Sequence, residues 1–236
     1  MNTREILTWL EKTGAKATRD AMARYGIVAR KACGVPMGAL LRKSKEIGKD
    51  HALALALWDT GCYEARLLAT LIGEPEKLTR ARMNAWAKGF ENWADGDTAC
   101  FKLFDRSPLA WEMIRPWAKS PREMTRRGGY ALLASLALHD KKAADDRFLA
   151  FLPLIEEGAK DERNFVKKGV NWALRGIGRR NPVLLAAASE TATRLSASPA
   201  PAPRWVGRDA LREFARLAGK KKSAVRLKPA GSSTRR

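Results

Sequence analysis

The sequence predicts an all-α fold, an α-solenoid of HEAT-like helical repeats. Three observations support this prediction: apolar residues recur at three-and-four spacing along much of the chain, no run alternates with period two, and one segment repeats. The chain has 236 residues, of which 45% are hydrophobic. That fraction is too high for a disordered chain, so we expect most of the sequence to fold.

Candidate helices lie between residues that break helices. Apolar residues recur at helical spacing within residues 53–72, 131–138, 148–155, 165–177 and 184–195. The breakers are Gly34-Val35-Pro36, Gly73-Glu74-Pro75, Ser107-Pro108, Ser120-Pro121, Asn181-Pro182 and the cluster from Pro199 to Pro203. Short helices joined by short turns indicate a stack of helices.

An internal repeat supports the solenoid. Residues 124–133 align with residues 165–174 at a constant offset of 41 residues, and both segments place a hydrophobic residue, a basic pair, a glycine and apolar residues at matching positions. HEAT and armadillo units repeat every 40–47 residues or so. The alternative is a chance match in a chain rich in Ala, Leu and Arg. The concave side of a solenoid offers an extended surface for a duplex.

Positive charge is the most unusual property of the composition. The chain carries 45 Lys and Arg against 25 Asp and Glu, a formal net charge of +20. Seven basic residues and no acidic ones fall in residues 219–236, which we predict to be a disordered basic tail after a single domain of residues 1–218. Without these seven charges the domain still carries +13, which predicts a concave basic face and an anionic polymer as partner.

A membrane surface is the competing partner, and the sequence argues against it. No segment has the basic amphipathic pattern with a bulky apolar face that surface binding requires. The longest uncharged apolar stretch, residues 131–138, is far shorter than the roughly 20 residues that span a bilayer. The chain also opens on no secretory signal. We therefore expect a cytoplasmic, nucleoid-associated protein without a membrane partner.

The number and spacing of the cysteine and histidine residues indicate neither a metal site nor a catalytic nucleophile. The three cysteines Cys33, Cys62 and Cys100 form no closely spaced pair, and only His51 and His139 are available to join them as ligands. No disulfide framework or zinc site fits this pattern, and we expect the cysteines to be small buried side chains. We predict neither a metal site nor a cofactor.

A basic stripe is predicted on the helix around residue 172. Lys168, Trp172, Arg175 and Arg179 fall at i, i+4, i+7 and i+11, so they share one face of a helix. Such a stripe suits phosphates, with the indole packed on sugar or base. The alternative is that Trp172 belongs to the core and the cations are its solvated neighbours.

A second stripe leads from aromatic residues to a carboxylate. Trp86, Phe90, Trp93 and Asp97 have the same spacing if one helix continues past Gly96. An apolar aromatic wall raises the pKa of a neighbouring carboxyl group, which marks a candidate functional residue. Alternatively, Asp97 caps a following helix over residues 98–104, and Asp95 is its rival in either role.

Basic residues at 126 and 127 complete the set of candidates. Arg126 and Arg127 follow the Ser120-Pro121 break on one helix. They form either another solvated face or a clamp for phosphate.

These residues resemble the DNA alkylation repair family, the HEAT-like-repeat alkylpurine DNA glycosylases of the AlkD type. The resemblance covers roughly residues 20–195. The motifs that carry it are Trp58 with Tyr63-Glu64-Ala65-Arg66, Trp93-Ala94-Asp95-Gly96-Asp97, Met124-Thr125-Arg126-Arg127, and residues 164–175 followed by Asn181-Pro182. The resemblance implies a solenoid that wraps double-stranded DNA and hydrolyses the N-glycosidic bond of cationic N3- or N7-alkylated purines.

The resemblance also assigns roles to individual residues. The family's catalytic aspartate matches Asp97, its two DNA-facing tryptophans match Trp93 and Trp172, and its phosphate-contacting arginine matches Arg127. The family's aromatic residue in an N-terminal helix near the substrate has no clear counterpart around Met22 to Tyr25. Arg126, Lys168, Arg175 and Arg179 are expected to add contacts to DNA.

The chemistry implied by the resemblance agrees with the side chains present. An alkylated purine is already a cation and leaves as a neutral base, so no general acid is needed. A carboxylate such as Asp97 stabilises the oxocarbenium-like sugar and positions water. No catalytic lysine is singled out, so we predict a monofunctional glycosylase that does not cut the strand. A solenoid that wraps DNA works as a monomer, and we expect a monomer. The rival hypotheses are a non-catalytic module that binds duplex or branched DNA and a protein–protein scaffold.

Overall fold

The computed structural model describes the backbone of residues 1–226 and the side chains of residues 1–217, and all regular elements in this part are helical. The α-helices are α1 (Thr3–Thr13), α2 (Lys16–Arg24), α3 (Met37–Ile47), α4 (His51–Asp59), α5 (Tyr63–Ile72), α6 (Arg80–Lys88), α7 (Trp93–Lys102), α8 (Ala110–Ala118), α9 (Glu123–His139), α10 (Asp145–Leu149), α11 (Leu152–Gly158), α12 (Asn164–Gly178), α13 (Pro182–Ser196) and α14 (Pro201–Arg226). Two short 3-10 helices are η1 (Pro75–Lys77) and η2 (Phe104–Arg106). The all-α prediction is confirmed. None of the described helices is both long and apolar enough to traverse a bilayer.

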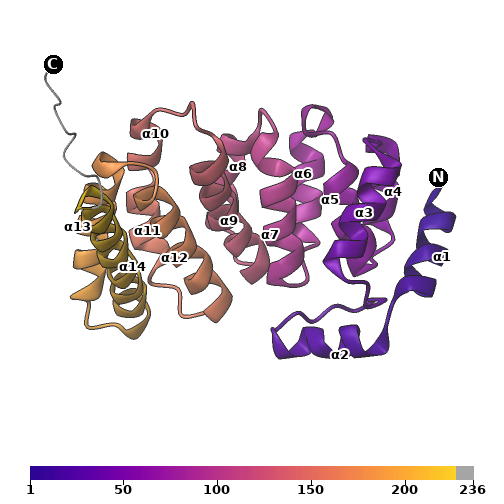
Figure 1. Cartoon of the computed structure of the whole chain (residues 1–236), viewed down its shortest axis with the longest axis horizontal. Coiled ribbons are helices and arrows are strands. Elements are labelled where there is room, and N and C mark those ends of the chain that lie inside the picture. The colour runs from indigo at the N-terminus through magenta and orange to yellow at the C-terminus, as the bar shows by residue number, and fades with distance from the viewer. Residues whose placement is uncertain (227–236) are drawn as a thin grey trace, which may run out of the picture.

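The helices stack in two layers (Figure 1). In one layer α3, α5, α7, α9, α12 and α14 follow one another, each packed against the next, and we call this layer the α7–α9–α12 row. Behind it α4 packs on α5, α8 on α9, α11 on α12 and α13 on α14. The result is a solenoid of helix pairs, as predicted, in which each pair contacts mainly its neighbours.

The repeat found in the sequence marks equivalent helices. α9 begins at Glu123 and α12 begins at Asn164, which reproduces the offset of 41 residues, and the two helices pack directly against each other. Matching positions of the two segments therefore lie on neighbouring helices of the same row. The interpretation as consecutive repeats is confirmed.

Helix boundaries follow the predicted breakers. α8 and α9 begin shortly after Ser107-Pro108 and Ser120-Pro121. At α13 the side-chain oxygen of Asn181 accepts a hydrogen bond from the amide of Leu184 at 2.9 Å, and Pro182 takes the first helical position. Proline is tolerated there because its missing N–H would have no partner within the helix.

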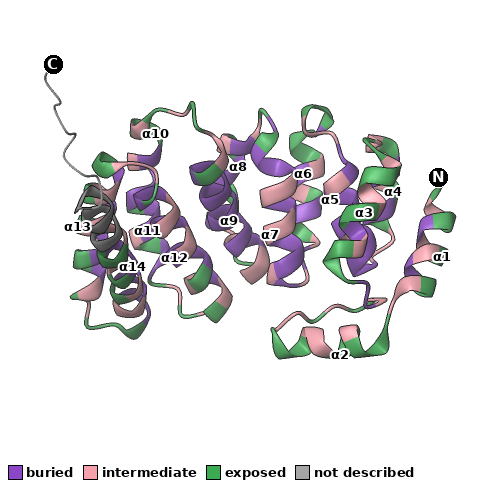
Figure 2. Cartoon of the chain, in the orientation of Figure 1, coloured by how far each residue is buried: buried purple, intermediate pink, exposed green. Residues whose placement is uncertain are grey.

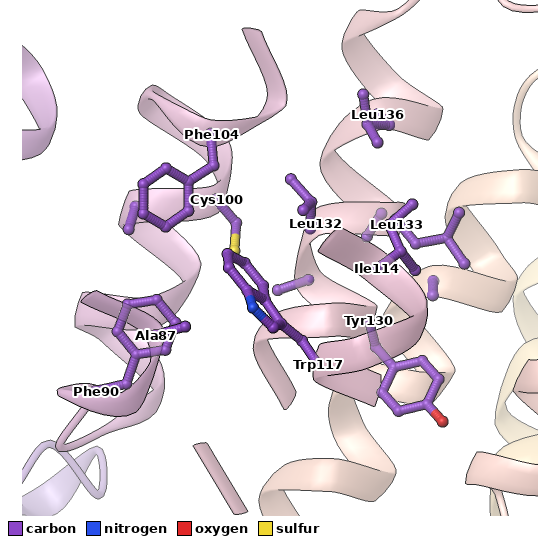
Figure 3. Packing of buried hydrophobic residues seen from close by; sticks show 14 of the residues in the cluster. Ala87, Phe90, Cys100, Phe104, Ile114, Trp117, Tyr130, Leu132, Leu133 and Leu136 are labelled. Atoms are coloured by element: carbon purple, nitrogen blue, oxygen red, sulfur yellow. The ribbon is translucent and has the colours of Figure 1, made fainter. Parts of the chain in front are cut away.

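An aromatic core fills the space between the layers. Buried residues lie mainly where the helices face one another (Figure 2). The rings of Trp58 and Trp86 stack with centroids 4.1 Å apart, and Phe90 meets Trp117 edge to face at 6.5 Å. Figure 3 shows Phe90, Phe104 and Trp117 pointing into the same core. This core holds α6, α7, α8 and α9 in fixed relative positions.

The single helix predicted through Trp86, Phe90, Trp93 and Asp97 is wrong. α6 ends at Lys88 and α7 begins at Trp93. A new helix starts there because the side chain of Asn92 accepts from the amide of Ala94 at 3.0 Å and forms a capping box with Asp95. Trp86 and Phe90 are core residues, whereas Trp93 and Asp97 lie one turn apart on α7.

α14 continues beyond Gly219, the residue at which the predicted tail begins, and ends at Arg226. Lys and Ala favour helix, and no proline interrupts the sequence before Pro229. The helix thus includes the first eight residues of that predicted tail. The other residues of the predicted tail, 227–236, lie outside the described residues.

Candidate functional site

Asp97 and Arg127 form an ion pair between α7 and α9. The Nε of Arg127 donates to Oδ1 of Asp97 at 2.9 Å, and its Nη2 donates to Oδ2 at 2.7 Å. The Asp97 side chain is 16% exposed and the Arg127 side chain is 9% exposed. Parallel contacts of this kind fix the plane of the carboxylate as well as its position.

Arg127 also connects this pair to α12. Its Nη1 donates to the backbone carbonyl of Phe165 at 2.8 Å, in the first turn of α12. Gly169 leaves room for this arrangement, because a Cβ at that position would lie 3.2 Å from Cγ of Arg127. Through these bonds Arg127, on α9, contacts both α7 and α12.

Two opposing effects act on the titration of Asp97. Burial raises the pKa of the Asp97 carboxyl group, while the guanidinium of Arg127 acts to lower it. Each carboxylate oxygen has two lone pairs, and Arg127 uses one on each. The partly exposed carboxylate keeps acceptor capacity for a water molecule or a ligand.

Trp93 lies beside the pair and is held by the N-terminal region. Its Nε1 donates to the backbone carbonyl of Tyr25 at 2.9 Å, and the guanidinium carbon of Arg127 lies 5.9 Å from the centre of its ring. The side chain of Asn92 donates to the carbonyl of Val28 at 3.3 Å. The segment after α2 therefore packs on the start of α7.

Tyr25 is a residue of this site that sequence reasoning missed. The residue is 71% exposed, while its carbonyl accepts a hydrogen bond from the Trp93 indole. No pattern in the sequence joins the end of α2 to residue 93, because the contact is made between backbone and side chain 68 residues apart. The fold thus supplies an exposed aromatic residue near Trp93.

Asp95 has a structural role that separates it from Asp97. Its oxygens accept from the amides of Glu91 at 3.0 Å and Asn92 at 3.3 Å, and its side chain is 1% exposed. Burial raises the pKa of Asp95 to about 6. Asp97 lies inside α7, so the alternative that it caps a following helix is wrong.

The predicted basic stripe does lie along α12, but acidic residues pair with two of its three cations. Lys168 is exposed and Trp172 is half-buried. Arg175 contacts Asp209 at 3.1 Å and Glu213 at 2.9 Å.

The last member of the stripe is neutralised in the same way. Arg179, which follows the last residue of α12, pairs with Glu213. Both acids come from α14, more than 30 residues later in the chain, so the spacing within α12 gave no sign of them. Lys168 thus remains the exposed cation of the stripe that has no acid beside it in the described part of the chain.

Arg126 is also engaged within the protein. Its Nε lies 3.3 Å from Oδ2 of Asp161, and its side chain is 23% exposed. Asp161 itself accepts two hydrogen bonds from the guanidinium of Arg163. Arg126 and Arg127 therefore diverge from adjacent positions, one toward Asp161 and the other toward Asp97.

The fold brings two of the three cysteines together. The sulfurs of Cys33 and Cys62 lie 3.9 Å apart, and with Glu64 they form a group of potential metal ligands. The Glu64 carboxylate already accepts from the amides of Cys33 at 2.9 Å and Gly34 at 2.6 Å. Burial raises the pKa of both thiols. Glu64 therefore uses both carboxylate oxygens to hold the backbone at Cys33 and Gly34.

Comparisons with known proteins identify the family and the fold of the chain. A solved structure described as "A new family of proteins related to the HEAT-like repeat DNA glycosylases with affinity for branched DNA structures" aligns with a TM-score of 0.77 at 19% identity, over 92% of this chain and 95% of that chain. No curated protein matches the sequence significantly. The sequence model of the family described as "DNA alkylation repair enzyme" matches residues 6–214. The chain therefore belongs to the DNA alkylation repair enzyme family.

Proposed function

We propose that the protein is a monofunctional DNA glycosylase that releases cationic N3- or N7-alkylated purines from duplex DNA. The observation that carries this proposal is the Asp97 carboxylate, which is oriented by Arg127 and lies on the same helix as Trp93, one turn away. The family assignment supports DNA as the substrate. Asp97 is the group that acts on the sugar in this proposal.

The chemistry requires negative charge beside the sugar and little else. The alkylated base departs as a neutral molecule, and positive charge develops on the deoxyribose. A carboxylate held in a partly desolvated place stabilises that charge more strongly than one in bulk water. Asp97 also has lone pairs left to accept a hydrogen bond from the attacking water.

Arg127 acts in this proposal as a positioning residue for Asp97. Its guanidinium favours the ionised form of the carboxylate and holds it in a fixed plane, and its bond to the Phe165 carbonyl keeps the guanidinium in place. The expected contact of Arg127 with phosphate remains a prediction. Because the Arg127 side chain is largely buried, such a contact requires the arginine to give up a bond to the protein or to share one.

Release of methylated purines by matched variants tests the proposal. We expect wild type to release N7-methylguanine or N3-methyladenine from methylated duplex DNA, and Asp97→Asn to lower the rate about 100-fold or more while DNA binding persists. The control is Asp59→Asn, which removes one acid at the exposed end of α4. Equal rates for wild type and Asp97→Asn would refute the role of Asp97. Strand cleavage by purified protein would refute the monofunctional assignment.

A second candidate function is DNA binding without excision. It is favoured by the structural similarity to proteins described as having affinity for branched DNA structures. The position of Asp97 is compatible with this function, because both of its carboxylate oxygens are bonded to Arg127 and it can serve to hold α7 and α9 together. In this case wild type releases no base, and both wild type and Asp97→Asn bind a four-way junction more tightly than the equivalent duplex.

A further inference from the structure

A pocket of about 520 Å³ opens between the segment after α2 and the turn from α6 to α7. We call it the α6–α7 pocket. Its lining includes the exposed side chains of Arg30, Lys88 and Arg122, together with the largely buried Arg66. Of the residues named in the sequence analysis, Phe90 and Arg66 line it, whereas Arg30, Lys88 and Arg122 were not singled out there.

The balance of charge in this pocket is strongly positive. Glu91 is the one acid in the lining, and the protein already uses it: its Oε2 accepts from the amide of Arg30 at 3.0 Å, and its Oε1 lies 3.4 Å from Nη1 of Arg66. The side chains of Arg30, Lys88 and Arg122 pair with no acid in the described part of the chain. Three cations converging on one cavity are suited to an anionic group with several oxygen atoms.

Arg66 adds a further positive charge at the wall of the pocket. Its Nη1 donates to the Gly89 carbonyl at 3.0 Å, and its side chain is 12% exposed. Its buried Nε has no hydrogen-bond partner among the described residues. That nitrogen is shielded from solvent, so Arg66 contributes positive charge, rather than a free donor, to the wall of the pocket.

The pocket adjoins the candidate active site. Its wall residue Val28 accepts a hydrogen bond from Asn92, the N-cap of α7, and Trp93 follows directly. Arg122 is the N-cap residue of α9, the helix that carries Arg127. A DNA strand placed on Asp97 therefore has the pocket close by, at the ends of the same two helices.

We propose that the α6–α7 pocket binds a phosphodiester group of the DNA strand next to the site of excision, through Arg30, Lys88 and Arg122. This inference rests on the proposed function only in assuming that DNA lies along the α7–α9–α12 row. The phosphodiester belongs either to the duplex or to a single-stranded arm that leaves it. The site does not depend on whether the base is excised.

The test compares two double variants that remove the same charge. Lys88→Ala with Arg122→Ala removes two cations from the pocket. Lys141→Ala with Lys142→Ala removes two exposed lysines beyond the other end of α9, about 25 Å away along the helix. All four side chains are exposed, so both proteins should fold. Binding is measured by fluorescence anisotropy over a range of salt concentrations with a labelled duplex, the same duplex carrying a single-stranded flap, and the single strand alone.

We expect the pocket variant to bind roughly tenfold more weakly than the control variant at about 0.1 M salt. The slope of log K against log salt should fall by about 1.8 if both lost contacts are to duplex phosphates, and by about 1.4 if they are to a single strand. A loss confined to the flapped substrate assigns the phosphodiester to the single-stranded arm. Equal affinities and slopes for the two double variants on all three DNAs would overturn the proposal. If the two double variants differ in this way but wild type releases no base, the proposed excision is refuted and the pocket assignment stands.

Discussion

Replacing Arg127 by methionine removes the guanidinium and keeps most of the side-chain volume. Arg127 makes two hydrogen bonds to Asp97 and one to the Phe165 carbonyl, and the replacement breaks all three. The Asp97 side chain, which is 16% exposed, is then left without the positive charge of the guanidinium beside it. Removing one partner of a buried ion pair costs about 3–5 kcal/mol, and the residual exposure of this pair places the expected loss near 3 kcal/mol.

Urea unfolding followed by far-UV circular dichroism measures this loss. For a chain of this size 3 kcal/mol corresponds to a decrease in Tm of about 6–12 °C. The double variant Arg127→Met with Asp97→Asn removes both charges, so we expect it to regain about 1–2 kcal/mol relative to Arg127→Met alone. This recovery distinguishes an unpaired charge from simple loss of packing.

The same variant should show a defined dependence on pH. Burial already raises the pKa of Asp97, and without Arg127 nothing opposes this effect. A carboxyl whose pKa is higher in the folded state binds more protons there, so the stability of Arg127→Met should fall as the pH rises from about 4 through the folded-state pKa. The stability lost relative to wild type should therefore be smaller at pH 5 than at pH 7. A double variant as unstable as Arg127→Met, or a loss below about 1 kcal/mol at pH 7, would refute the reasoning.

Two further predictions concern residues that support the site. Burial raises the pKa of Asp95 to about 6, so ionisation of this group lowers the stability of wild type as the pH rises from about 4 to 6. Denaturation curves of Asp95→Asn across that range should lack this loss of stability. The same pH profile in wild type and Asp95→Asn would contradict the prediction. A Cβ at Gly129 would lie 2.4 Å from the backbone nitrogen of Ala118, so Gly129→Ala should cost about 3 kcal/mol in unfolding free energy. The control is Gly176→Ala, in which the new Cβ would have its closest neighbour at 3.4 Å. This control variant should have a Tm within about 2 °C of wild type. Equal Tm values for the two variants would argue against the close contact of α8 and α9.

The pairing of Arg175 and Arg179 with α14 changes how the basic stripe is expected to meet DNA. Asp209 and Glu213 share these two arginines, and Asn171 donates to Asp209 at 2.6 Å. Phosphate contacts by either arginine compete with these acids. Of the cations predicted on α12, Lys168 alone is exposed without an acid beside it among the described residues, so it is the member of the stripe best placed to bind phosphate directly.

The sequence by itself determined the class of fold and the positions of its repeats. Apolar spacing and helix breakers are local signals, and they predicted the helix boundaries at Ser120-Pro121 and Asn181-Pro182 as well as the relation between residues 124–133 and 165–174. The break between α6 and α7 was missed because the capping box of Asn92 and Asp95 outweighs the continuous aromatic spacing on either side. The cap at Asn92 starts a new helix, so the aromatic residues before and after it belong to two different helices.

Only the tertiary structure decided which side chains meet. Asp97 and Arg127 are 30 residues apart, and Trp93 reaches a backbone carbonyl 68 residues away, so no spacing rule connects them. The same holds for the acids that neutralise Arg175 and for the three cations of the α6–α7 pocket. Helical periodicity assigns a residue to a face of its own helix, but the electrostatics of a site depend on charges that neighbouring helices bring within a few ångströms.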